Sequence, residues 1–179
     1  SQDTSVEATL LLNAVALIST FGLLPTLAAW IGRNQFKTTF RLQPSGILSI
    51  IGSILLGLGA WAFAHEAFVI ADAIGIGGLS DKQIAGAEAT IAKMRETSPF
   101  LLIAVFALTP AVIEELCFRG YLFSAIRTAV SPLRTVLITA FLFGLFHVLT
   151  GSALLVERFV PSTLMGLIIG WVAYRTGSV

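Results

Sequence analysis

The stretch FLLIAVFALTPAVIEELCFRGYLFSAI, residues 100–126, combines a long apolar run with three charged side chains near its middle. A helix that crosses a bilayer needs about 20 mostly apolar residues, and this stretch is long enough. It lacks the sustained alternation of apolar and polar residues that is typical of a strand. The stretch therefore predicts a membrane-spanning helix that carries charge inside the membrane.

The composition of the whole chain agrees with this prediction. The 179 residues are 56% hydrophobic and only 12% charged, whereas a soluble domain carries about 25% charged residues. The net charge is +1, so no strong field attracts a polyanion, and we expect no nucleic-acid partner. The single cysteine, Cys117, excludes a disulfide framework and a cysteine-cluster metal site, and we expect it in the core.

Five apolar stretches are long enough, or nearly so, to cross a membrane. They run over Thr9–Ile31, Ser45–Ala71, Phe100–Ile126, Leu133–Leu149 and Ser162–Tyr174. Helices satisfy their own backbone hydrogen bonds in lipid, so helices are expected in all five. The predicted fold is all-α, a polytopic transmembrane helix bundle with about five spans present.

The charges of the connections separate by side. One set of connections is basic and contains no acid: Arg33, Lys37, Arg41, Arg127, Arg134 and Arg175. The other set contains Lys82, Lys93, Arg95 and Arg158 with Asp3, Glu7, Asp72, Asp81, Glu88, Glu96 and Glu157. The positive-inside rule places the first set in the cytoplasm and the N-terminus outside. We therefore expect an integral membrane protein, in a bacterial cytoplasmic membrane, with lipid as a partner.

The polar segment Gly75–Ser98 is predicted to be an external connection. It contains a short amphipathic helix, because apolar residues recur at helical spacing: Ile84, Ala87, Ile91 and Met94. This helix is expected to lie at the membrane surface, and a lid that gates substrate entry is the alternative.

Four charged residues have no aqueous position in this arrangement: Glu66, Glu114, Glu115 and Arg119. The last three would together oppose membrane insertion by roughly 8–10 kcal/mol without compensation. On an α-helix Glu115 and Arg119 share a face, which suggests a structural ion pair. Glu114 is turned about 100° from Glu115. A carboxyl group in a medium of low dielectric constant can take up and return protons near neutral pH, which makes Glu114 a candidate general base.

The next span supplies a possible partner, His147. Counted from the cytoplasmic side, Glu114 lies 15 residues from Ala129, and His147 lies 14 residues from Leu133. At 1.5 Å per residue these depths are about 22 and 21 Å. Two adjacent antiparallel helices would therefore hold the carboxyl group and the imidazole at one level of the membrane.

Two prolines, Pro25 and Pro110, fall inside predicted spans and should bend them, because proline has no N–H to donate. Pro110 leaves the carbonyl of Phe106 without its helical donor, one turn from Glu114. The position has room for a water molecule, which hydrolysis requires.

These residues resemble known motifs. Glu114-Glu115-x-x-x-Arg119 resembles the EExxxR motif of the CAAX protease and bacteriocin-processing (CPBP) intramembrane proteases, and Phe143-x-x-x-His147 resembles their FxxxH motif. The similarity covers residues 99–179. We therefore expect two parts, residues 1–98 with the N-terminal helices and the external segment, and residues 99–179 as a CPBP-like catalytic core.

The resemblance implies an intramembrane endopeptidase that acts on a peptide or protein substrate. It implies that Glu114 activates water, that His147 binds or polarises this water, and that Glu115, Arg119 and Phe143 support them. In the family a further helix with His and Asn would follow Val179. We therefore expect the core to be incomplete and the chain to be part of a longer polypeptide. The possible partners include other membrane segments, fused to the chain or associated with it. One histidine and one glutamate make a poor zinc site, so no cofactor is expected, with zinc left open. The alternative is a non-enzymatic membrane component, either a permease-associated segment or an inactive scaffold of the same fold.

Overall fold

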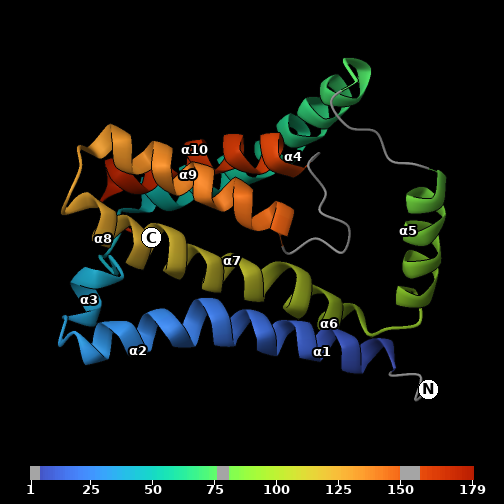
Figure 1. The fold of residues 1–179 in the computed structure, drawn as a ribbon, viewed down its shortest axis with the longest axis horizontal. Coiled ribbons are helices and arrows are strands. Elements are labelled where there is room, and N and C mark those ends of the chain that lie inside the picture. Colours follow the sequence, from blue (N-terminus) through green and yellow to red (C-terminus); the bar gives the residue numbers. More distant parts are fainter. Residues whose placement is uncertain (1–4, 76–80, 150–157) are drawn as a thin grey trace. The chain divides into compact units, whose positions relative to one another are not determined.

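The computed structural model of the protein describes residues 5–75, 81–149 and 158–179, and Figure 1 shows them as a set of helices. Within these ranges the chain forms helices and turns and no strand. The predicted all-α class is thus confirmed. Asp3 and Glu157, which the charge pattern assigned to the outer side, lie outside the described residues.

Among the described residues, three helices are long and apolar enough to cross a membrane: Val6–Ile31, Pro99–Arg127 and Pro132–Leu149. The remaining two predicted spans also coincide with helices, α4 (Ile47–Ala73) and α10 (Phe159–Thr176). All five predicted stretches are therefore helical, and three of them meet the length and composition of a span.

The distribution of exposed side chains is the reverse of that in a water-soluble protein. Leu48 and Phe100 are 81% and 83% exposed, while Arg119 and Thr135 are 1% and 0% exposed. Apolar residues that point outward on long helices suit contact with lipid, and such large exposed apolar surfaces are rare on soluble monomers. The helices therefore present their apolar side chains to a membrane, and the protein is an integral membrane protein.

The chain divides into two compact units, each made of two stretches of the sequence. The first unit comprises residues 1–35 and 79–117. Its described helices are α1 (Val6–Leu17), η1 (Ile18–Leu23), α2 (Leu24–Ile31), α5 (Asp81–Met94), α6 (Pro99–Ile103), η2 (Ala104–Leu108) and α7 (Thr109–Glu115). The π-helix η1 packs on α7, where Gly22 faces the side chain of Ile113.

The two intraspan prolines of the first unit follow π-helical segments. Pro25 lies at the start of α2, just after η1, and Pro110 at the start of α7, just after η2. The hydroxyl of Thr109 donates a hydrogen bond to the carbonyl of Ala104 at 2.8 Å, five residues earlier. The carbonyl of Ala104 thus accepts from both the N–H and the hydroxyl of Thr109 in a wider helical turn, and the bends predicted at the two prolines stay predictions.

The predicted amphipathic helix of the external segment is α5, so its helical structure is confirmed. Ile84 and Ile91, two members of its apolar stripe, are 42% and 55% exposed. Its position at a membrane surface stays a prediction.

The second unit comprises residues 36–78 and 118–179. Its helices are α3 (Phe36–Thr39), α4, most of η3 (Leu116–Leu122), α8 (Phe123–Arg127), α9 (Pro132–Leu149) and α10. Figure 1 shows α9 and α10 running alongside each other, and their backbones approach closely at glycines. A Cβ on Gly166 would lie 2.9 Å from Cα of Ala140, and one on Gly144 would lie 3.0 Å from the carbonyl of Phe159. Small residues at a contact of this kind are typical of helix association in membranes.

Buried hydroxyl groups on α9 are satisfied by their own helix. Thr139 donates to the carbonyl of Thr135 at 2.9 Å, and Thr135 donates to the carbonyl of Ser131 at 3.1 Å. Both buried hydroxyl groups therefore have a hydrogen-bond acceptor within their own helix. They need no partner on a neighbouring helix, which allows close packing in lipid.

Candidate functional site

Helix α9 presents Phe143 and His147 one turn apart. The centroids of their rings are 4.5 Å apart, and Nδ1 of His147 lies 2.9 Å from the carbonyl oxygen of Phe143. A carbonyl oxygen only accepts hydrogen bonds, so Nδ1 carries the proton in this contact. In a neutral imidazole the lone pair then belongs to Nε2, which is the nitrogen that can bind water or accept a proton.

Arg119 lies in the same unit and is almost fully buried. Its guanidinium carbon is 4.2 Å from the centroid of the Phe143 ring and 6.0 Å from that of Phe118. A cation over the face of an aromatic ring is stabilised by about 2 kcal/mol when both groups are desolvated. The ring of Phe143 therefore replaces part of the hydration that burial takes from Arg119.

Three phenylalanines enclose these polar groups, and we call them the aromatic cluster: Phe118, Phe143 and Phe146. The rings of Phe118 and Phe143 meet edge to face at 5.1 Å, and those of Phe118 and Phe146 lie 5.8 Å apart. Phe146 in turn contacts the His147 ring at 5.2 Å. Aromatic pairs at these separations add about 0.5–1.5 kcal/mol each beyond their burial, so the cluster fixes the positions of Arg119 and His147.

The structure thus brings three of the five predicted site residues together in the second unit: Arg119, Phe143 and His147. The other two, Glu114 and Glu115, lie at the end of α7 in the first unit, and both are half-buried. The pairing of Glu114 with His147 and that of Glu115 with Arg119 stay predictions.

The helical geometry around these residues differs from the expected continuous α-helix. Glu114 and Glu115 end an α-helix, whereas Arg119 lies in the π-helix η3. A π-helix has wider turns than an α-helix and occurs often at functional sites. The four-residue spacing of Glu115 and Arg119 therefore spans two helix types, so the α-helical wheel used for the prediction does not hold over its second half.

Gly120 explains how η3 fits against a neighbouring segment of the second unit. A Cβ at this position would lie 2.9 Å from the carbonyl oxygen of Phe40 and 3.1 Å from its Cα. Any larger residue would push the backbone at Phe40 away. Arg119 and Gly120 are thus adjacent positions with different roles, one packed on aromatic rings and one on backbone.

Arg41, whose charge the sequence assigned to membrane topology, makes tertiary contacts that the sequence did not predict. In the structure Arg41 is half-buried and donates a hydrogen bond to the carbonyl of Ala173, and its guanidinium lies 4.6 Å from the Phe123 ring centroid. Its backbone adopts φ +55°, which is rare for a residue other than glycine. That φ cannot be inferred from a short basic cluster, so the sequence contained no usable signal.

Metal ligation is limited among the described side chains. In that part of the chain no group of three or more His, Cys, Asp or Glu residues lies close enough together to hold a metal ion. Cys117 is 5% exposed, as expected for a core residue.

Long apolar helices and a buried cluster of arginine, histidine and aromatic side chains define the class: a membrane helix bundle with ionisable groups in its interior. A comparison with protein families matches residues 96–179 to the family described as type II CAAX prenyl endopeptidase Rce1-like, which is consistent with the CPBP resemblance. Residues 96–179 are thus similar to that family. Neither a curated protein nor a solved structure matches the chain. This similarity supports a protease-type enzyme of the membrane at the level of that family.

Proposed function

We propose that the protein is an intramembrane endopeptidase in which a glutamate activates the attacking water, and that it works in a bacterial cytoplasmic membrane. The observation that carries the proposal is the contact of Arg119, Phe143 and His147 within residues matched to a prenyl endopeptidase family. These residues occupy positions in both motifs of the resemblance. Residues 99–179 form the catalytic core under this proposal.

In the proposed reaction Glu114 accepts a proton from water as the water oxygen attacks the carbonyl carbon of the scissile peptide bond. Glu114 then gives this proton to the departing amine, so the carboxylate is regenerated at the end of the cycle. General acid–base catalysis by a positioned side chain contributes about 10²–10⁴-fold to the rate.

His147 orients the water in this scheme. The hydrogen bond of Nδ1 with the Phe143 carbonyl supports a tautomer with its lone pair on Nε2. That nitrogen can accept a hydrogen bond from the water and hold it for attack. Arg119 and Phe143 are positioning residues, since Arg119 lies on the ring that contacts the imidazole, and Glu115 is proposed to support them as well.

The experiment compares two Glu→Gln variants of the protein reconstituted in lipid vesicles. The substrate is a fluorogenic prenylated peptide with a CAAX sequence, the chemistry that the family description names. Glu114→Gln is expected to lower kcat by about 10²–10⁴-fold. Glu88→Gln, an identical chemical change at an exposed position of α5, is the control and should retain activity.

Full activity of Glu114→Gln would remove this residue from the mechanism. Equal loss in both variants would mean that the change acts through folding or insertion rather than chemistry. Activity measured before and after exhaustive chelation decides separately whether zinc takes part.

A further inference from the structure

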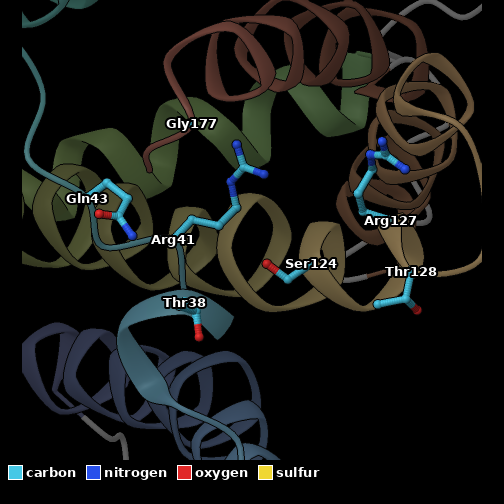
Figure 2. Close-up of a pocket in the computed structure, with 7 residues that line it drawn as sticks. All are labelled: Thr38, Arg41, Gln43, Ser124, Arg127, Thr128 and Gly177. Carbon is cyan, nitrogen blue, oxygen red and sulfur yellow. The ribbon is translucent and has the colours of Figure 1, made fainter.

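The second unit contains a pocket of about 360 Å³ that the catalytic proposal does not use. It lies where three segments meet, the connection between α3 and α4, the end of α8 and the end of α10 (Figure 2). Its volume is within the range of about 300–1,000 Å³ that small-molecule sites occupy. Arginine, hydroxyl and amide groups line it: Thr38, Arg41, Gln43, Ser124, Arg127 and Thr128, together with Gly177.

The lining is positively charged and contains no acidic residue. Figure 2 shows the hydroxyl of Ser124 between the side chains of Arg41 and Arg127 in this view. The guanidinium groups of Arg41 and Arg127 and the hydroxyl of Ser124 all belong to residues of this lining, and Nη1 of Arg127 also donates to the carbonyl of Val130 at 2.9 Å. Arginine is the side chain best suited to bind a phosphate, because its planar fork matches two phosphate oxygens.

Arg41 is held in place before any ligand binds. Its side chain donates to the carbonyl of Ala173 and lies on the Phe123 ring, and its own carbonyl accepts from the N–H of Val179 at 3.2 Å. The neighbouring carbonyl of Gln43 accepts from the hydroxyl of Ser178 at 2.7 Å. These contacts hold Arg41 in place before a ligand binds. Binding then costs little conformational entropy at this residue, which favours tight binding.

The charge of Arg41 is also incompletely compensated. Its Nε is buried and has no hydrogen-bond acceptor among the described residues. Burial lowers the pKa of Arg41 from its ordinary value, although an arginine stays protonated. A half-buried cation at a pocket wall favours an anionic ligand.

The position of the pocket indicates where the anion comes from. Arg41 and Arg127 belong to the connections that the charge pattern assigns to the cytoplasmic side, at the ends of membrane helices. Anionic lipids give that surface a negative potential, and basic pockets between membrane helices on this side bind phospholipid headgroups. We propose that this pocket binds the phosphate group of an anionic phospholipid headgroup.

The test measures thermal unfolding of the purified protein in a neutral detergent. Three probes are titrated separately: short-chain phosphatidylglycerol, phosphatidylcholine of the same chain length, and inorganic phosphate. Phosphatidylglycerol is expected to raise Tm saturably, because binding to the folded state stabilises it, and phosphatidylcholine to raise it less. Arg127→Gln should weaken phosphatidylglycerol binding at least tenfold. The control is Arg134→Gln, which removes an exposed arginine of the same side from outside the pocket and should stay within twofold of the unaltered protein.

Ser124→Ala provides a second variant that changes no charge, and it should weaken phosphatidylglycerol binding severalfold. If inorganic phosphate raises Tm as strongly as the lipid, with the same dependence on Arg127, the phosphate site is supported and the free anion is its ligand. The proposal is overturned if neither phosphatidylglycerol nor phosphate gives a saturable shift. It is also overturned if Arg127→Gln and Arg134→Gln weaken binding equally, because the attraction would then be a property of surface charge alone.

Discussion

Replacing Phe143 with leucine tests the proposed role of the aromatic cluster. The leucine keeps an apolar side chain in the core but removes the ring that lies 4.2 Å from the Arg119 guanidinium carbon. The lost contact with the buried cation is about 2 kcal/mol, and the lost edge-to-face pair with Phe118 is about 0.5–1.5 kcal/mol. Phe143→Leu should therefore lower the free energy of unfolding by about 3 kcal/mol.

The matched control is Phe141→Leu on the same helix. Phe141 is 52% exposed and has an edge-to-face contact with the Phe159 ring at 5.6 Å. This variant should lose about 0.5–1.5 kcal/mol, the contribution of one aromatic pair.

Both free energies of unfolding can be measured by titrating SDS into the protein in mixed micelles and following tryptophan fluorescence. A difference of about 2 kcal/mol between the variants is expected, which corresponds to the contact with Arg119. Equal destabilisation of the two variants would refute the conclusion that the Phe143 ring compensates the buried charge.

Two further predictions concern packing. Gly166→Ala should lower the free energy of unfolding by about 1–3 kcal/mol, because its Cβ would lie 2.9 Å from Cα of Ala140. Gly57→Ala, in α4 with nothing within 4 Å of the added Cβ, should be neutral or stabilising by up to about 1 kcal/mol, and a loss as large as that of Gly166→Ala would contradict the assignment of close α9–α10 packing. Cys117, 5% exposed, should react with a water-soluble maleimide only after unfolding, as followed by mass spectrometry, and rapid labelling of the folded protein would contradict its burial.

The sequence was most informative about properties that depend on one segment at a time. The apolar run around Phe100–Ile126 and its four counterparts predicted helices that the structure contains, because an apolar segment of that length must satisfy its backbone internally in lipid. The amphipathic helix α5 was predicted by the same local reasoning, from the spacing of Ile84 and Ile91.

The helical wheel was less successful within one span. It assumed 3.6 residues per turn from Glu114 to Arg119, whereas the structure changes to a π-helix at Leu116. In this π-helix Gly120 lies close to the Phe40 backbone, a contact between distant segments that no local sequence pattern predicts.

The sequence by itself determined that this is a membrane protein built of helices. It also determined which segments carry the charges and that the two motifs lie in consecutive spans. Only the tertiary structure decided which side chains meet, the ring of Phe143 under Arg119, Gly166 against Ala140, and Arg41 with Arg127 around one pocket. The physical reason is the separation along the chain over which each kind of information acts. Hydropathy and helical periodicity act between residues a few positions apart, whereas these contacts join residues far apart along the chain, whose approach depends on the shapes of whole packed helices.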